Sequence, residues 1–349
     1  MARRRALVIG GGVAGLAAAI SLARQGARVT VAEREVGWSV ADWGLSLPGR
    51  ALRALATLGL VDACLWCGYG ATQIAHCDPA GVVRDRVELP RTLGPDRPAL
   101  LGLGRATLHQ ILRGEAERSG ALLRDGLTAT RIAQTPDGVG VHLSDGSTAH
   151  VDLVVGADGL SSTVKTLVGI DDQPGYTGQV AWRATVRRPD WATGPHTFTG
   201  APHVAGLVPI SPRHAFVFLT ERDADPAAVP EDRLAERMRA LMAGFAGRAA
   251  EARDAIGDSV TVTRHPVRTG LVDRPWHRGR VVLVGDAAHA FPPGLDVGAA
   301  LAFEDAIVLA DELAQRDLAQ HDDEESALKA FGARRLDRCR ATAATAATA

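Results

Sequence analysis

The feature that most constrains the fold is the stretch RALVIGGGVAGLAAAISLARQGARVTVAE, residues 5–33. Residues 6–9 are a short apolar run, too brief for a helix, which predicts a buried parallel strand. A glycine-rich turn follows, then apolar residues at helical spacing up to Gly26, and then Val29 and Val31 alternate as in a second strand. This order of strand, turn, helix and strand indicates a dinucleotide-binding unit.

The glycines of this turn have separate expected roles. Gly10 permits a tight turn, Gly12 lets backbone N–H groups approach a pyrophosphate, and Gly15 lets the helix lie close to the sheet. The first turn of that helix, with Val13 and Ala14, then offers free donors and the positive end of the helix dipole. We therefore expect these residues to bind phosphate groups.

Glu33 stands at the end of the second strand, where a carboxylate can accept the ribose hydroxyls of an adenosine. The alternative for this stretch is a signal peptide, since residues 3–5 are arginines that precede an apolar segment. Three turn glycines and a second strand ending in Glu33 have no role in a cleaved leader, so we prefer the binding unit. The unit alone does not distinguish FAD from NAD.

Composition excludes several classes of function. The chain has 349 residues and a formal net charge of -1, so no general field attracts it to nucleic acid or to an anionic membrane. No apolar run is long enough to span a membrane. Four cysteines in a chain of this length fit a reducing cytoplasm better than a disulfide framework. We expect a cytoplasmic protein whose partners are small molecules; the oligomeric state stays open.

Two cysteines, Cys64 and Cys67, have the spacing of a redox or zinc motif, and His76 and Cys77 follow. The pair lacks a second matching pair and lies well beyond the first strand-helix-strand unit. We therefore expect these cysteines to be small buried hydrophobes, and we predict no metal site.

Three segments are expected to lack regular structure or to be solvated. Residues 34–48 have no clear period and predict a long loop across the cofactor site. The acidic run at residues 322–325 predicts a solvated linker. Residues 341–349 repeat Ala and Thr without charge, and we expect a disordered tail.

Four stretches, in order, make the chain resemble the single-component FAD-dependent aromatic hydroxylases, the p-hydroxybenzoate hydroxylase-like flavoprotein monooxygenases. They are the unit at residues 10–33 followed by Arg34, Arg105 at the start of a predicted helix, GADGLSSTVK at 156–165, and GDAAHAFPPGLDVGAALAFEDA at 285–306. One glycine motif is common, but four in this order are specific. The resemblance covers most of the chain.

The resemblance implies an α/β fold in which a discontinuous Rossmann-like FAD-binding domain is interrupted by a β-rich substrate domain. We assign residues 1–70, 100–175 and 270–340 to the FAD-binding domain. The β texture of residues 71–99 and 176–269 assigns them to the substrate domain.

The cofactor-binding residues follow partly from chemistry and partly from the resemblance. FAD carries ribityl hydroxyls that need an acceptor, and Asp286 stands just beyond a second buried strand. The helix starting after Pro293 can present the backbone N–H groups of residues 297–299 to the flavin pyrimidine edge; these residues are Val297, Gly298 and Ala299.

The resemblance alone assigns Arg34, Arg105, Leu127 and Asp158 to the cofactor sites. Arg105 would reach the pyrophosphate or ribityl region, Leu127 would lie by the adenine, and Asp158 would help to form the FAD and NAD(P)H sites.

The implied reaction uses NADPH or NADH to reduce FAD, O₂ to form a C4a-hydroperoxide, and oxygen transfer to an aromatic or related small molecule. Another flavoenzyme, such as a halogenase, an oxidase or a disulfide reductase, and a non-catalytic flavin-binding protein are the alternatives. The sequence identifies neither the substrate nor the preferred nicotinamide.

The chain departs from the family pattern at three quoted positions. Lys165 replaces a usual Arg, Gly49 stands where many members have Asn, and Asp296 replaces a glycine in the flavin-facing loop. Asp296 has two interpretations: it tolerates a left-handed backbone and faces solvent, or it is catalytic, with a raised pKa, and moves a substrate proton.

Overall fold

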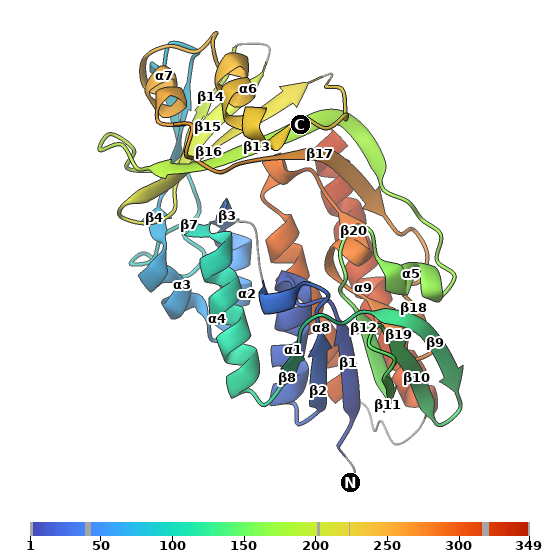
Figure 1. Ribbon diagram of the computed structural model, residues 1–349. Helices are drawn as coiled ribbons and strands as arrows, with labels where there is room; N and C mark the ends of the chain where they lie inside the picture. Colours follow the sequence, from blue (N-terminus) through green and yellow to red (C-terminus); the bar gives the residue numbers. More distant parts are fainter. Residues whose placement is uncertain (1–2, 39–42, 201–202, 223, 316–320, 348–349) are drawn as a thin grey trace.

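The computed structural model describes residues 3–38, 43–200, 203–222, 224–315 and 321–347. The lower half in Figure 1 is built on a mainly parallel sheet of order β18-β19-β12-β1-β2-β8. Only the β18–β19 pair within it is antiparallel. The strands are β1 (Arg5–Ile9), β2 (Arg28–Ala32), β8 (Leu122–Arg124), β12 (Leu153–Gly156), β18 (His277–Arg278) and β19 (Val281–Leu283). The carboxyl ends of β1, β2, β12 and β19 therefore meet at one edge.

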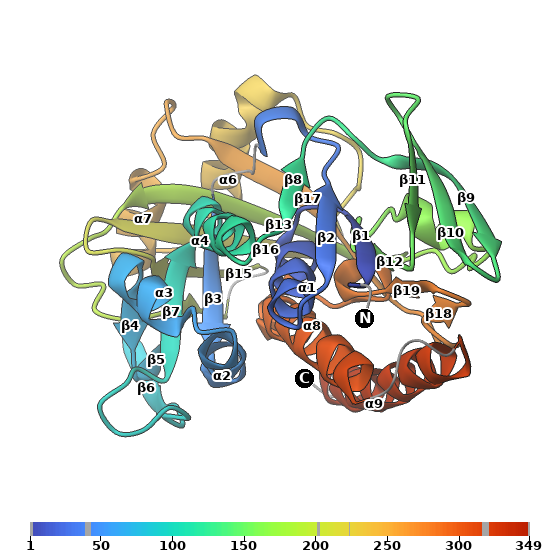
Figure 2. The same cartoon turned by 90° about the horizontal axis from the view of Figure 1, so that it is seen from below.

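Helices and a small antiparallel sheet cover this parallel sheet. Helix α1 (Val13–Arg24) packs on α4 (Arg105–Arg118) and α8 (Gly298–Ala314), and Figure 2 shows α9 (His321–Ala347) beside α8. Strands β10 (Gly138–Leu143) and β11 (Thr148–Val151) contact β12 and β1 and extend to β9 (Ala129–Thr135). The apolar segments of β1 and α1 are buried, as their sequence pattern requires.

The upper half in Figure 1 is a large mixed sheet of order β20-β17-β13-β16-β15-β14-β5-β6. Helices α6 (Leu234–Leu241) and α7 (Gly247–Asp254) cover one face, and Met238, Phe245 and Trp182 lie in a second core there. The strands are β5 (Gln73–Cys77), β6 (Val83–Glu88), β13 (Gly175–Arg187), β14 (His196–Phe198), β15 (Val204–Pro209), β16 (His214–Arg222), β17 (Val262–Leu271) and β20 (His289–Ala290).

A small sheet, β3-β7-β4, lies between the two halves. It joins β3 (Gly44–Pro48), β7 (Leu100–Gly104) and β4 (Tyr69–Ala71), while α2 (Gly49–Thr57) and α3 (Val61–Cys67) follow beside it. The expected loop at 34–48 is therefore partly wrong, because η1 (Val36–Trp38) and β3 are regular; residues 39–42 lie outside the described part. A Cβ at Gly44 would come 1.9 Å from the Phe216 ring, so β3 touches the large sheet.

The C-terminal expectations need correction. Helix α9 includes the acidic run, and Glu324 is buried, pairing with Arg280 and with Arg4 at 3.6 Å. The same helix continues to Ala347, because alanine is the best helix former, and it leaves only residues 348–349 of the predicted tail undescribed. Thr342 is buried and its hydroxyl donates to the carbonyl of Arg338 at 3.0 Å.

The α/β class, the Rossmann-like unit and the additional β-rich sheet are confirmed. The large sheet takes its strands from residues 73–88, 175–222 and 262–271, with β20 added from 289–290. Our division into FAD-binding and substrate domains stays a prediction. No helix in the described ranges is both long and apolar enough to cross a membrane.

Candidate flavin site

The glycine turn after β1 has the geometry that a dinucleotide site requires. Gly10 has φ +104°, and a Cβ there would lie 2.3 Å from the carbonyl oxygen of Ala157. A Cβ at Gly15 would lie 1.9 Å from the carbonyl oxygen of Gly10, so the close approach of α1 to the sheet depends on glycine. At Gly12 a Cβ would meet no atom within 4 Å. The backbone at Gly12 is therefore open to a ligand, and α1 starts there without a side-chain cap.

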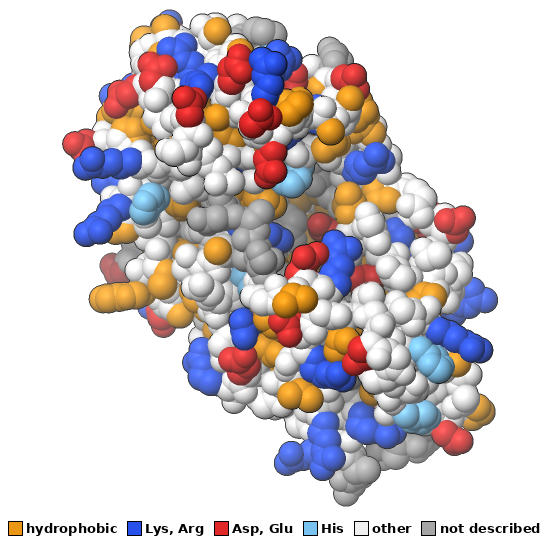
Figure 3. Space-filling view, viewed as in Figure 1, with side chains coloured by type: hydrophobic (Ala, Val, Ile, Leu, Met, Phe, Trp, Pro, Cys, Tyr) orange, Lys and Arg blue, Asp and Glu red, His pale blue; other side chains and the backbone are white. Residues whose placement is uncertain are grey.

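A cavity of about 290 Å³ opens at this turn. Figure 3 shows the surface hollowed between the two halves of the molecule. Most residues predicted from the sequence to bind the adenosine and pyrophosphate line the cavity: Gly10, Gly12, Glu33, Arg34, Arg105, Leu127 and Asp158. Val13 and Ala14 begin the adjoining helix, half-buried. The fold thus gathers residues that are up to 148 positions apart, from Gly10 to Asp158, in one place.

Glu33 lies directly over the turn. Its Oε2 accepts the N–H of Gly11 at 2.6 Å, and its Oε1 accepts the N–H of Glu35 at 2.9 Å. The N–H of Leu127 donates to the Glu33 carbonyl at 2.8 Å, which brings Leu127 to the same wall. Each carboxylate oxygen keeps a lone pair for a ribose hydroxyl.

Arg105 interacts electrostatically with Asp286 and with Glu33 at the adenosine end of the cavity. Burial lowers the pKa of Arg105, and the charges of Asp286 and Glu33 oppose that shift. Asp286 lies in η3 (Gly285–Ala287), directly after β19, and is exposed by surface area. The protein atoms around its carboxyl raise the pKa of Asp286 by desolvation, while His289 and Arg105 act against it.

Asp158 and Lys165 are both engaged in the local structure of α5. The Asp158 carboxylate accepts the Ser162 hydroxyl at 2.5 Å and the N–H of Thr163 at 2.7 Å, so it caps α5 (Thr163–Leu167). Lys165 is buried in that helix, and the charges of Asp172 and Asp158 partly oppose the lowering of its pKa by burial. Asp158 therefore reaches the cavity while its carboxylate is engaged in the cap.

Two buried histidines support the site and were missed from the sequence. Nε2 of His109, in α4, lies 2.8 Å from the carbonyl oxygen of Gly11, and this contact stabilises the glycine turn. Burial lowers the pKa of His109, so its ring is neutral near pH 7. No local pattern marked it, because its partner Gly11 lies 98 residues earlier in the chain.

The second histidine, His289, belongs to a buried network behind Asp286. Its Nε2 lies 2.7 Å from Oδ2 of Asp305 in α8, and that oxygen also accepts the N–H of Gly285 at 2.8 Å. Oδ1 of Asp305 accepts Nε of Arg335 in α9 at 2.6 Å. Burial alone would raise the pKa of Asp305, but His289, Arg335 and the Gly285 N–H outweigh it, and the pKa is lowered.

The loop before α8 brings Asp296 toward the large sheet. Asp296 follows η4 (Pro293–Leu295) and has φ 51° and ψ 29°, the left-handed conformation that its glycine-like position predicted. Asp296 is exposed to solvent. The protein atoms around its carboxyl nevertheless raise the pKa of Asp296 to about 7 by desolvation, while a hydrogen bond from Ser46 in β3 and the charge of Arg183 in β13 lower it. The left-handed backbone and the exposure of the first interpretation, and the raised pKa of the second, are thus all present.

Val297, Gly298 and Ala299 are half-buried at the start of α8, whose N-cap is Val297 and carries no side-chain cap. Their early N–H groups therefore have the freedom to bind a ligand. Their contact with a flavin stays a prediction.

Trp43 connects the cofactor cavity to the large sheet. The Arg105 guanidinium lies 4.7 Å from the centre of the Trp43 ring, and the Arg183 guanidinium lies 5.4 Å from it. His265 of β17 meets the same ring edge-on at 5.1 Å. The Trp43 ring thus contacts one cation of the cofactor cavity, Arg105, and one cation of the large sheet, Arg183.

The cysteine motif gives no sign of a metal site. Cys64 is buried as expected, and burial raises the pKa of Cys64 to about 12, but Cys67 is exposed, so the expectation of a buried side chain is wrong for Cys67. Within the described ranges, no group of three or more His, Cys, Asp or Glu is placed to hold a metal ion.

The fold and the turn define a dinucleotide-binding flavoprotein, and comparison with known proteins gives the family. The model of the FAD binding domain family matches residues 3–346. The 3-amino-4-hydroxybenzoate 2-monooxygenase of Streptomyces platensis is 35% identical over 97% of this chain and 85% of its own. The FAD-dependent urate hydroxylase of Klebsiella pneumoniae is 31% identical over 96% of this chain and 87% of its own.

Comparison with solved structures supports the same family. The crystal structure of Klebsiella pneumoniae HpxO complexed with FAD and uric acid matches with a TM-score of 0.84 and 28% identity, over 98% of this chain and 87% of that one. The chain belongs to the family of FAD-dependent aromatic hydroxylases.

The residues present fit FAD. The open backbone at Gly12 admits a pyrophosphate, Glu33 lines the cavity at the turn, and a second carboxylate, Asp286, follows β19. Arg105 lines the cavity, interacts electrostatically with both carboxylates and carries a charge suited to phosphate. The same fit does not distinguish NADH from NADPH.

Proposed function

We propose that this protein is an NAD(P)H-dependent monooxygenase that adds one oxygen atom of O₂ to an aromatic or heterocyclic small molecule. The carrying observation is the contact chain from Arg105, which lines the cofactor cavity, through Trp43 to Arg183, which faces Asp296. It joins residues proposed to hold FAD to a carboxyl group, Asp296, whose pKa is raised to about 7. The named activities of the relatives support the reaction class.

When bound, FAD supplies the redox chemistry, both acceptance of a hydride from NAD(P)H and activation of O₂. The protein holds it through the α1 N-terminus at the pyrophosphate, Glu33 at the ribose and Asp286 at the ribityl chain. Val297, Gly298 and Ala299 would donate N–H groups to the pyrimidine edge, where negative charge gathers on reduction.

The side chains beyond Trp43 orient the substrate. Val208 of β15, Ile210 directly after it, and Phe216 and Phe218 of β16 form an apolar cluster, and Phe216 touches β3 at Gly44. This cluster offers an apolar wall for the body of a substrate beside β3. Arg183 supplies a positive charge opposite Asp296, and a substrate with an ionisable hydroxyl or amino group fits between the two.

Asp296 is the proposed proton acceptor. With a pKa of about 7 it is part protonated and part ionised at neutral pH, which suits a group that takes a proton from a substrate and later releases it. Asp286, near the flavin's expected position, is assigned to cofactor binding only.

The test is a screen of hydroxybenzoates, aminobenzoates, hydroxyquinolines and purines with the FAD-loaded protein. NADH and NADPH consumption, O₂ uptake, hydrogen peroxide and product mass are followed together. We expect one or more compounds to accelerate NAD(P)H consumption and to gain 16 mass units. Peroxide as the sole product with every compound would indicate an oxidase, and no NAD(P)H consumption would indicate a flavin-binding protein without turnover.

A further inference from the structure

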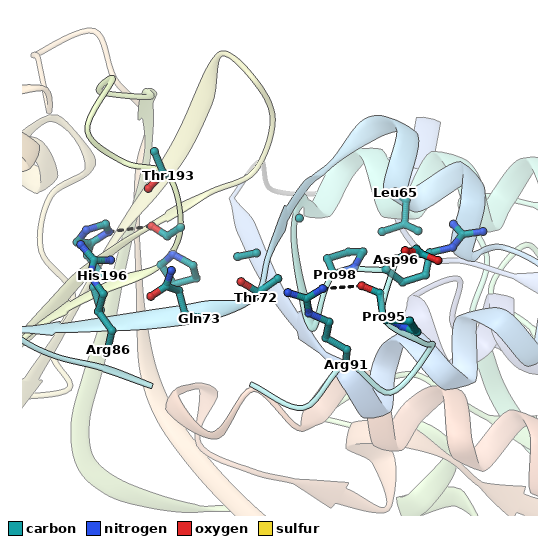
Figure 4. Close-up of a pocket in the computed structure, with 16 residues that line it drawn as sticks. Leu65, Thr72, Gln73, Arg86, Arg91, Pro95, Asp96, Pro98, Thr193 and His196 are labelled. Atoms are coloured by element: carbon teal, nitrogen blue, oxygen red, sulfur yellow. Dashed lines mark hydrogen bonds between the residues drawn. The ribbon is translucent and has the colours of Figure 1, made fainter. Parts of the chain in front are cut away.

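A second cavity, of about 510 Å³, lies away from the glycine turn and shares no lining residue with the cofactor cavity. Figure 4 shows Arg86, Gln73 and His196 on one side of it, Arg91, Pro95 and Pro98 on the other, and Thr72 between them. The volume is within the usual range for small-molecule sites. The cavity is lined by none of the residues that we assign to the FAD site or to the substrate site beside Asp296.

The cavity lies where two parts of the fold meet. Thr72 separates β4, in the small sheet, from β5, in the large sheet. One wall is therefore the β5, β6 and β14 edge of the large sheet, and the other is the segment at residues 91–98 with Leu65 of α3. Junctions between such units are favoured places for ligands.

The charges on these walls are mostly positive. Arg97 is neutralised by Asp62 at 2.6 Å, and Asp96 is the one carboxylate among the lining residues. Arg91 donates to the Pro95 carbonyl at 2.5 Å and has no ion pair with a described residue. The guanidinium of Arg86 has neither a hydrogen bond nor an ion pair within the described part of the chain.

A buried histidine, His196, lies in the positive electrostatic field of nearby arginines. His196 is 2% exposed, lines the cavity and places Nδ1 2.8 Å from the carbonyl oxygen of Gly194. Burial lowers its pKa, and the charges of Arg248 and Arg86 lower it further. The ring is therefore neutral, and the guanidinium charges are left for a ligand to balance.

We propose that this cavity is a second binding site, for a small organic anion whose oxyanion group pairs with Arg86 or Arg91 on the two opposite walls. Leu65, Pro95 and Pro98 receive an apolar body, while Thr72, Gln73 and Thr193 offer polar contacts. A carboxylate and a phosphate monoester share the required chemistry, because both present oxygens to guanidinium groups. This site is independent of the proposed function.

The experiment is isothermal titration of the FAD-loaded, full-length protein at about 50 mM ionic strength, where exposed charges are weakly screened. The probes are benzoate, phenyl phosphate and inorganic phosphate. We expect saturable binding of benzoate or phenyl phosphate, and weaker binding of inorganic phosphate, which has no apolar body. The preference between the first two distinguishes a carboxylate site from a phosphate site.

The variants assign the binding to this cavity. The Arg86→Gln/Arg91→Gln double variant should weaken binding at least tenfold. Arg84→Gln, on the same strand but paired with Asp78 at 2.5 Å, should leave it unchanged. Each single variant should retain part of the binding, which keeps the test valid should the double variant unfold.

Three outcomes would overturn the proposal. One is that none of the probes binds. Another is that binding survives the double variant but disappears in Arg183→Gln, which would place the probe beside Asp296 instead. The third is that Arg84→Gln weakens binding as much as the double variant, which would indicate a general charge effect.

Discussion

Asp305 in α8 joins the turn before Asp286 to the C-terminal helix, because its two carboxylate oxygens face opposite ways, Oδ2 toward His289 and Oδ1 toward Arg335, at 2.7 and 2.6 Å. All three side chains are at most 3% exposed. The last helix is therefore part of the support of the flavin site.

Asp305→Asn should destabilise the protein by about 1–3 kcal/mol, because buried Arg335 keeps Glu304 at 2.9 Å but loses the charge of Asp305. Unfolding in urea measures this. The matched control is Arg334→Gln, one position earlier, whose half-exposed guanidinium pairs with Glu312 at 2.7 Å and should matter far less. Equal effects of the two variants would contradict the network's importance.

Gly12→Ala and Gly15→Ala separate the two uses of glycine in the turn. Gly12→Ala should fold normally but retain FAD poorly, because the methyl group has space only where the pyrophosphate approaches. Gly15→Ala should lose stability, since its Cβ would lie 1.9 Å from the carbonyl oxygen of Gly10. Thermal unfolding without added FAD and FAD retention on dilution measure the two effects, and the opposite pattern would refute the assignment.

Asp286→Ala and Glu33→Gln should weaken FAD binding, because the ribityl and ribose hydroxyls each lose a charged acceptor. The expected loss is about 1.5–3 kcal/mol, roughly 10- to 100-fold in Kd. Glu117→Gln is the control, since Glu117 is exposed, pairs with Arg113 of its own helix at 3.4 Å and does not line the cavity. Full FAD occupancy of both variants under dilution would show that the cofactor residues are misassigned.

Asp296→Asn should lower the coupling of NAD(P)H consumption to product and increase hydrogen peroxide, while flavin reduction stays near normal. In the unchanged protein, coupling should rise with pH through about 7, as the Asp296 carboxyl ionises, and the variant should lose this dependence. Asp296→Gly tests the turn alone. Equal coupling in all three proteins across the pH range would leave Asp296 as a turn residue.

Stability gives an independent check of the same pKa. Because the folded pKa of Asp296 lies above its unfolded value, its contribution favours folding at low pH and is lost as pH rises through about 7. The melting temperature of Asp296→Asn, relative to the unchanged protein, should therefore be higher at pH 8 than at pH 5. A difference that does not change with pH would contradict the raised pKa. The exposure of Asp296 to the hollow makes the effect small.

The local pattern predicted the glycine turn, Glu33 and the strand before Asp286, because spacing within one short segment determines them. It could not predict His109 or the Asp305 contacts. His289 and Arg335 are 46 residues apart, and their meeting depends on how α8 and α9 pack. The tail was predicted wrongly for a related reason. Its Ala and Thr repeat looks like low complexity, but alanine favours a helix. The burial of Thr342, which depends on the tertiary structure, stabilises that helix further.

The central claim is oxygen transfer, and the most direct measurement is isotope incorporation from ¹⁸O₂ by the FAD-loaded protein with NAD(P)H and a compound that accelerates its consumption. We predict one ¹⁸O atom in each product molecule, and about one NAD(P)H oxidised for each in a well-coupled reaction. Product oxygen that comes from H₂¹⁸O instead, with ¹⁸O₂ recovered only as hydrogen peroxide, would contradict the account.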